Sequence, residues 1–264
     1  MVASGAVKRP PVRATAGPEG PEAPEGPEGP PSLEGMTLLL IRHGQIEANT
    51  RHELETRIPG PELTALGEEQ AAALPSLLAD VPIVAIHASV MQRTQLTAAP
   101  LAEDRSLDVV VTPGLEEIDA GDLTMRSDDV SVDTYLSTAL GWAAGELDRA
   151  MPGGPNGHAF FERYDAAVEA VVAAASDAGG ADGGGSGVAV AFSHGAAIRT
   201  WVAGRAVNAA GSDALARALG NTGVVELELV DGEWHLVAWE GTPWTELVAP
   251  DREADPTEPD RPAR

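Results

Sequence analysis

Short, unbroken apolar runs recur along the chain, and stretches with helical spacing separate them. The first run is MTLLLIR at 36–42, and further runs lie at 82–87, 109–111 and 188–192. An apolar run of this length without alternation is typical of a parallel strand that is buried on both faces. We therefore predict a parallel sheet that contains these four strands.

Helical patterns fill the intervals between the predicted strands. Thr64 can cap a helix that Pro75 should kink or end early, and Ser89 precedes a second helix. Two more helical stretches, separated by the sequence MPGGPNG, lie within 130–176 and are expected to cover the functional site, whatever its chemistry. This alternation predicts an α/β fold with three layers, α/β/α, in which a mostly parallel central sheet carries a helical lid insertion.

Near the C-terminus the pattern changes to that of an antiparallel hairpin. Residues 224–230 and 234–239 are rich in strand formers, and Asp231-Gly232 between them is a strong turn signal. The hairpin should extend the sheet at one side. Its outer edge is a surface through which a homodimer could form.

Both ends of the chain are too polar to fold on their own. Residues 1–35 repeat Gly-Pro-Glu, and residues 249–264 are rich in proline and charge. Such segments cannot bury enough apolar surface to offset the entropy of ordering. We predict one folded domain at 36–248 between two disordered tails, and Met36 could be the true start of the protein.

The charge balance narrows the possible partners. The chain has 41 Asp and Glu against 17 Lys and Arg, a formal net charge of −24, and no cysteine. Nucleic acid and anionic membranes are therefore not expected as partners, and any phosphate site must be a local cluster of Arg and His. The lack of cysteine excludes disulfides, thiolate nucleophiles and cysteine-based zinc sites. No leader-like or membrane-spanning apolar run is present, so the cytoplasm is the expected location.

Two predicted strands end in the same way. The first ends at Arg42-His43-Gly44 and the fourth at Ser193-His194-Gly195. Ligands of open α/β sheets bind at the carboxyl edge of the strands, and glycine lets the backbone approach a ligand closely. A single histidine in this position is more often structural. Two such turns together with Arg42 favour a site that binds one anion.

The motifs around these turns resemble those of the histidine phosphatase superfamily, the phosphoglycerate mutase-like group with an RHG motif. The family signature LxxRHGxxxxN matches LLIRHGQIEAN at 39–49. Further matches follow in the family order and are LTALGEEQA at 63–71, SVMQRTQLTA at 89–98, LEEIDAG at 115–121 and FSHG at 192–195. Several motifs in order, each in its expected strand or helix context, make a chance match improbable.

The resemblance implies a role for six residues. Three are catalytic, namely His43 as nucleophile, Glu117 as proton donor and His194 as a hydrogen-bond donor. Three bind the phosphoryl group, namely Arg42, Asn49 and Arg93. The family uses no metal and no cofactor, so none is expected here. A backbone carbonyl near Gly44 should fix the tautomer of His43, and the neighbouring arginines should lower its pKa and keep it neutral.

These roles predict a metal-independent phosphomonoester hydrolase that acts through a phosphohistidine intermediate. It would be a histidine acid-type phosphatase with a small-molecule phosphomonoester as substrate. A phosphoglycerate mutase-like phosphotransferase and a catalytically silent binder of phosphorylated ligands are the alternatives. Many family members read GxWEG and GGES where this chain has 121–125 and 153–156, and Ile46 replaces a usual threonine. These departures lie on the expected substrate side and leave the substrate open.

Overall fold

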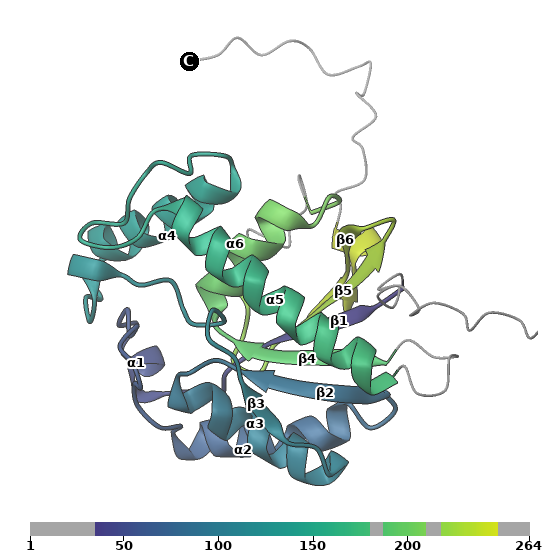
Figure 1. The fold of residues 1–264 in the computed structure, drawn as a ribbon. Coiled ribbons are helices and arrows are strands. Elements are labelled where there is room, and N and C mark those ends of the chain that lie inside the picture. The colour runs from purple at the N-terminus through teal and green to yellow at the C-terminus, as the bar shows by residue number, and fades with distance from the viewer. Residues whose placement is uncertain (1–34, 180–186, 210–217, 248–264) are drawn as a thin grey trace, which may run out of the picture. The chain divides into compact units, whose positions relative to one another are not determined.

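The computed structural model describes residues 35–179, 187–209 and 218–247, all in one unit of the chain. Within these residues the strands form one sheet in the order β3-β2-β4-β1-β5-β6-β7 (Figure 1). Strands β1 to β4 are parallel to one another, and β5 to β7 are antiparallel to their neighbours. The strands are β1 (Thr37–Arg42), β2 (Ile83–Ala88), β3 (Val109–Val111), β4 (Val188–Ser193), β5 (Val224–Val230), β6 (Glu233–Trp239) and β7 (Thr242–Pro243).

Helices cover both faces of the sheet, which confirms the predicted α/β fold (Figure 1). Helices α2 (Ala65–Leu77) and α3 (Gln92–Arg105) lie on one face. On the other lie α5 (Gly157–Gly179) and α6 (Gly195–Arg205), with α4 (Asp129–Ala143) packed against α6. The short helices are α1 (Glu47–Thr50), the 3₁₀ turn η1 (Gly121–Leu123) and α7 (Trp244–Leu247).

Strand β1 shows why an unbroken apolar run was needed here. Leu38 and Leu40 belong to the core beneath α5 and α6, whereas Leu39 and Ile41 belong to the core beneath α2 and α3. All four are at most 5% exposed. Successive side chains of a strand point to opposite faces, so a strand covered on both sides must be apolar at every position. Burial of each such side chain contributes about 1.5–3 kcal/mol to folding.

The predicted helix start at Thr64 is confirmed, since its hydroxyl oxygen accepts a hydrogen bond from the Gly67 N–H at 3.1 Å. Pro75 lies in the last turn of α2, and the helix continues past it to Leu77. A proline in the final turn removes only one backbone hydrogen bond, so little of the helix is lost.

The predicted hairpin is present as β5 and β6. Asp231 and Gly232 both have positive φ, 52° and 79°, as a two-residue type I′ turn requires. The outer edge of β6, however, is partly occupied within the chain. The Val207 N–H donates to the Trp234 carbonyl at 2.9 Å. The Asn208 side chain bonds both backbone groups of Leu236. This edge is therefore less open than expected, and the homodimer stays a prediction.

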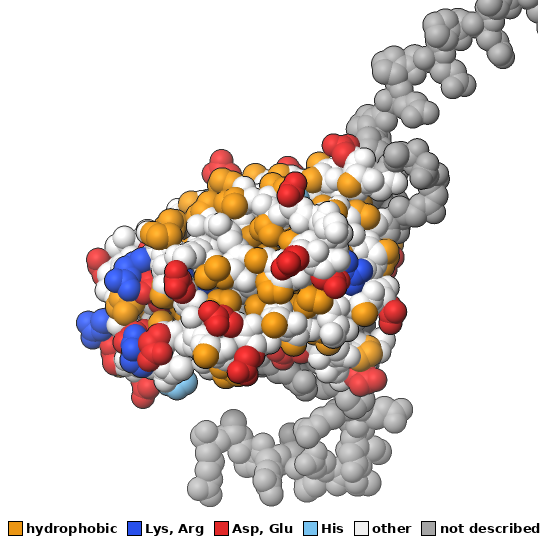
Figure 2. Space-filling model, turned by 90° about the horizontal axis from the view of Figure 1, so that it is seen from below, with side chains coloured by type: hydrophobic (Ala, Val, Ile, Leu, Met, Phe, Trp, Pro, Cys, Tyr) orange, Lys and Arg blue, Asp and Glu red, His pale blue; other side chains and the backbone are white. Residues whose placement is uncertain are grey.

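The predicted disordered tails, 1–35 and 249–264, lie outside the described residues except for Gly35, whose N–H donates to the Leu229 carbonyl. On the face shown in Figure 2, acidic side chains are spread over the surface and the few basic ones gather mostly at one end. Among the described helices, none has both the length and the apolar character that crossing a bilayer requires.

Candidate active site

The two histidine turns meet because β1 and β4 are neighbours in the sheet. Arg42 is paired in register with Ser193, the last residue of β4, and the His43 N–H donates to the Ser193 carbonyl at 3.1 Å. The rings of His43 and His194 lie 5.3 Å apart, centroid to centroid. Both side chains are buried. The fold thus brings together two histidines that are about 150 residues apart in sequence, as parallel strand ends predict.

The hydrogen bond of His43 determines which ring nitrogen can react. Its Nδ1 lies 2.7 Å from the Gly44 carbonyl oxygen. A carbonyl can only accept, so Nδ1 carries the proton and the lone pair remains on Nε2. Burial lowers the pKa of this imidazole well below its usual value, and the positive charges of Arg93 and Arg42 lower it further. His43 is therefore a neutral imidazole with a free basic nitrogen, as expected.

Glycine is required at position 44 because the loop passes close to the start of α2. A Cβ on Gly44 would lie 2.7 Å from the carbonyl oxygen of Gly67, too close for any real contact. The Gly44 N–H donates to the hydroxyl of Thr97 at 2.9 Å. The turn that carries His43 is thereby held by both α2 and α3.

Arg42 and Arg93 have N–H groups that no described residue satisfies. Arg93 is 1% exposed, and only its Nη2 donates, to the Glu55 carbonyl at 3.2 Å. Within the described part of the chain, its Nε and Nη1 and the Nε of Arg42 have no hydrogen-bond partner. Desolvation lowers the pKa of both guanidinium groups. Buried donors without partners are costly, so this arrangement favours an anion as ligand.

Asn49 is oriented by a residue that the sequence analysis did not identify. The Asn221 side-chain amide donates to Asn49 Oδ1 at 3.1 Å and to the His43 carbonyl at 3.0 Å. The Ile46 N–H donates to the same Asn49 oxygen at 3.0 Å. With its oxygen occupied by two donors, Asn49 has its NH₂ group left for a ligand. No sequence signal links Asn221 to the site, since it lies 172 residues away.

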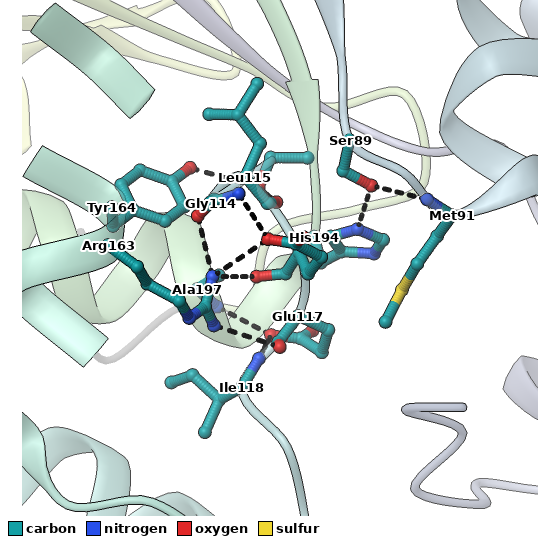
Figure 3. Close-up of polar contacts among 12 residues, drawn as sticks. Ser89, Met91, Gly114, Leu115, Glu117, Ile118, Arg163, Tyr164, His194 and Ala197 are labelled. Atoms are coloured by element: carbon teal, nitrogen blue, oxygen red, sulfur yellow. Dashed lines mark hydrogen bonds and ion pairs between the residues drawn. The ribbon is translucent and has the colours of Figure 1, made fainter. Parts of the chain in front are cut away.

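The carboxylate of Glu117 is bound by backbone amides. Its oxygens accept hydrogen bonds from Ile118 N–H at 2.9 Å, Ala197 N–H at 2.8 Å and Ala196 N–H at 3.2 Å (Figure 3). The last two belong to the first turn of α6, where backbone N–H groups lack helical partners. Glu116, the carboxylate that precedes Glu117 in the chain, instead pairs with Arg163 and accepts from the Gly114 N–H. The geometry therefore favours Glu117 over Glu116.

His194 lies beside His43 and bonds to Ser89. Its Nε2 is 2.9 Å from the Ser89 hydroxyl, which also accepts from the Met91 N–H at 3.2 Å (Figure 3). Burial lowers the pKa of His194 well below its usual value, and the positive charge of Arg93 adds to this effect. The neutral ring has one donor and one acceptor nitrogen. When the Ser89 hydroxyl donates to Nε2, the proton is on Nδ1, which has no partner within the described residues.

Five of the six predicted site residues line one cavity of about 190 Å³. They are Arg42, His43, Asn49, Arg93 and Glu117. His194 is not part of its wall, although its ring contacts His43. Further lining residues that the sequence analysis missed include Thr56, Tyr135 and Arg199. For Arg199 a signal existed, because it follows the His194 turn by one helical turn in a chain with few basic residues.

A second cavity, of about 670 Å³, adjoins the first and shares Thr56 and Glu117 with it. Its wall includes Thr124 and Pro155, which come from the two segments that depart from the family pattern. Trp142 of α4, which lies within the helical stretches predicted to cover the site, does not line this cavity. It is 1% exposed and stacks on Phe160 in the core. Over the described residues, no group of three or more His, Cys, Asp or Glu is placed to hold a metal ion.

Comparison with known proteins places these features in a family. A model of the histidine phosphatase superfamily (branch 1) matches residues 38–242. The PE-PGRS family protein PE_PGRS11 of Mycobacterium tuberculosis is 34% identical over 221 residues, which are 80% of this chain and 37% of that protein. The adenosylcobalamin/alpha-ribazole phosphatase of Escherichia coli is 33% identical over 142 residues, 54% of this chain and 68% of that enzyme.

A similar fold is found among solved structures. Mycobacterial glucosyl-3-phosphoglycerate phosphatase superposes with a TM-score of 0.61 at 25% identity, and the match covers 78% of this chain and 99% of that one. The chain spans less than two fifths of the length of the mycobacterial PE-PGRS relative. The family model, however, matches well over half of the chain. The chain belongs to the histidine phosphatase superfamily, branch 1.

Proposed function

We propose that the protein is a metal-independent phosphomonoester hydrolase that forms a phosphohistidine at Nε2 of His43. One observation carries the proposal. The 2.7 Å bond between His43 Nδ1 and the Gly44 carbonyl leaves a lone pair on Nε2, in a cavity that also contains donors of Arg42 and Arg93 without a partner among the described residues. A nucleophile and an anion-binding cluster in one small cavity suit phosphoryl transfer.

In the first half of the reaction, Nε2 of His43 attacks phosphorus as the bond to the ester oxygen breaks. Arg42, Arg93 and the Asn49 amide donate to the phosphoryl oxygens, where the negative charge of the transition state is spread. Glu117, protonated at this stage, gives its proton to the departing oxygen, so the product leaves as a neutral alcohol. His43 is left as phosphohistidine and Glu117 as carboxylate.

In the second half, water attacks the phosphohistidine. Glu117 takes one proton from the water as the new P–O bond forms and the P–N bond breaks. Inorganic phosphate is released, His43 regains the lone pair on Nε2, and Glu117 regains its proton. One carboxyl group thus serves as acid and then as base.

We place the alcohol part of the substrate in the second cavity. Glu117, the proposed proton donor, lines both cavities, so an ester oxygen within its reach lies at their junction. A volume of about 670 Å³ is in the range of small-molecule binding sites. This supports a small organic phosphomonoester as substrate. The lowered pKa of His43 suits an acid-type phosphatase, because the nucleophile stays unprotonated in mild acid. The cytoplasmic location stays a prediction.

The test is hydrolysis of 4-nitrophenyl phosphate in excess EDTA by the wild type and by His43→Ala, purified identically. We expect turnover that survives chelation and is lost in the variant. Quenching turnover of a substrate with a radiolabelled phosphoryl group in alkaline detergent should trap a labelled protein whose phosphate is base-stable and acid-labile, as phosphohistidine is. Phosphate binding by the wild type without turnover would overturn the proposal and favour a silent binder. Transfer of the phosphoryl group to an added phosphoglycerate in preference to water would favour a mutase.

A further inference from the structure

Arg163, on α5, binds the backbone of the segment that carries Glu117. Its Nη1 donates to the carbonyls of Gly114 at 2.6 Å and Glu116 at 2.9 Å, and its Nη2 donates to the carbonyl of Glu117 at 3.0 Å (Figure 3). Three carbonyl groups within four residues therefore converge on one guanidinium group. Such a planar fork of donors fixes the conformation of the segment far better than a single contact would.

The guanidinium is itself held in place. It lies 5.2 Å from the centre of the Phe160 ring, and a Glu116 carboxylate oxygen is 3.4 Å from Nη1. The same carboxylate oxygen accepts from the Gly114 N–H at 2.6 Å. Gly114 has φ of +103°, and a Cβ there would lie 2.5 Å from the Arg163 carbonyl, so the segment is pressed directly against α5. Arg163 is thus ordered before any substrate binds.

Glu117 is consequently held from two helices. Arg163 of α5 holds its backbone carbonyl, and the Ala196 and Ala197 amides of α6 hold its carboxylate. Proton transfer requires the carboxyl group to lie within about 2.6–3.2 Å of the ester oxygen. An error of about 1 Å in such a position can cost about 100-fold in rate. The backbone anchor therefore bears directly on the proposed proton transfer.

We propose that Arg163 is a positioning residue for proton transfer by Glu117; this rests on the proposed function of the site. Arg163 is part of the wall of the second cavity, but in this scheme it does not touch the reacting atoms. The proton passes from the Glu117 carboxyl to the ester oxygen as that oxygen leaves phosphorus. The benefit depends on the leaving group. 4-Nitrophenolate departs readily without a proton, whereas phenolate and alkoxides need one.

The experiment compares Arg163→Lys with the wild type on 4-nitrophenyl phosphate and phenyl phosphate, in the full chain. The ratio kcat/KM reports only the steps up to phosphorylation of His43, so the later base role of Glu117 does not enter. Lysine keeps the charge, but its single ammonium nitrogen cannot replace the planar fork in which Nη1 and Nη2 bond the three carbonyls. We expect kcat/KM to fall about 100-fold for phenyl phosphate and less than about threefold for 4-nitrophenyl phosphate. Glu117→Gln should show the same selectivity.

A double mutant shows whether Arg163 acts through Glu117. In a Glu117→Gln background, Arg163→Lys should change kcat/KM for phenyl phosphate by less than about twofold, because the two changes remove one function. Arg205→Lys is the matched control. Arg205 also stacks on an aromatic ring, 4.1 Å from the centre of Phe161, but it pairs with Asp165, away from both cavities. It should leave both substrates unaffected.

Equal losses for both substrates, or a full further loss in the Glu117→Gln background, would overturn the inference and assign Arg163 a purely structural role. If Arg163→Lys melts below the assay temperature, Glu116→Gln replaces it. That variant removes the charge of the ion pair that steadies the guanidinium, while its amide oxygen can still accept from the Gly114 N–H, and should give a several-fold effect with the same selectivity. Absence of His43-dependent turnover in the wild type would instead refute the proposed function, and the inference with it.

Discussion

Replacing Arg93 by methionine should separate stability from function, because most donors of its buried guanidinium have no partner among the described residues and are proposed to bind the phosphoryl group. It is 1% exposed, and two of its three nitrogens have no hydrogen-bond partner within the described residues. Methionine keeps most of the volume and removes the desolvated charge. We therefore expect Arg93→Met to make the ligand-free protein more stable and almost inactive.

The size of the stability change follows from the contacts. Relief of two unsatisfied donors is worth about 2–4 kcal/mol. Loss of the bond to the Glu55 carbonyl costs about 1 kcal/mol, and the small void left by the shorter side chain costs about 1 kcal/mol. The net gain is about 1 kcal/mol. For a domain of this size, that corresponds to a rise in Tm of about 2–4 °C.

The kinetic effect has the opposite sign. Removing donors that face the charge of the transition state costs about 100- to 1,000-fold in kcat. The loss of positive charge should also raise the pKa of His43, because Arg93 is the second largest cause of its lowering after burial. Burial remains, so the imidazole should still titrate below its usual value.

Thermal unfolding with and without inorganic phosphate tests this reasoning. Phosphate at about 100 times its Kd should stabilise the wild type by about 2.7 kcal/mol and the variant by much less, so the order of stability reverses. Arg105→Met is the control of opposite sign, since the Arg105 guanidinium donates to the carbonyls of Val81, Leu78 and Ala79. A less stable Arg93→Met without phosphate, or equal stabilisation of both proteins by phosphate, would refute the argument.

Three further results are expected. Asn221→Leu should raise KM for 4-nitrophenyl phosphate about tenfold with a smaller change in kcat, because it frees the Asn49 amide to turn; an unchanged KM in steady-state assays would contradict this. In the wild type, kcat/KM for 4-nitrophenyl phosphate should not fall as the pH drops through 6.5, because the lowered pKa keeps His43 neutral, and a loss of kcat/KM on the acid side of pH 6.5 would contradict this. The free energy of unfolding should fall as the pH drops below 6.5, by up to about 1.4 kcal/mol per pH unit for each of His43 and His194, because the unfolded chain takes up protons first. Urea titrations at several pH values should show that the unfolding free energy of His194→Asn depends less steeply on pH than that of the wild type.

The site could be predicted as far as its residues are marked by local motifs. A strand end followed by His-Gly is a short-range pattern, and two such patterns at the same sheet edge must meet when their strands are neighbours. The adjacency of β1 and β4 then brought His43 and His194 together. The roles of Arg93 and Glu117 came from family motifs, and the structure puts both in the same cavity as His43.

The residues that orient the site escaped prediction for a common reason. Ser89 is 105 residues from His194, Asn221 is 172 from Asn49, and Arg163 is 46 from the carbonyl of Glu117. Each makes an ordinary hydrogen bond whose partner depends on how helices and loops dock on the sheet. Side-chain type alone does not indicate such a partner.

The sequence by itself determined the α/β class, the order of the elements and the chemistry at the carboxyl edge, because these depend on local apolar periodicity and on short motifs. Only the tertiary structure decided which nitrogen of His43 is free, that backbone amides of α6 bind the Glu117 carboxylate, and that the outer edge of β6 is partly occupied by residues 206–208. These are questions of direction and distance between groups far apart in the chain. The packing of whole helices and strands determines these directions and distances, and no local sequence pattern indicates them.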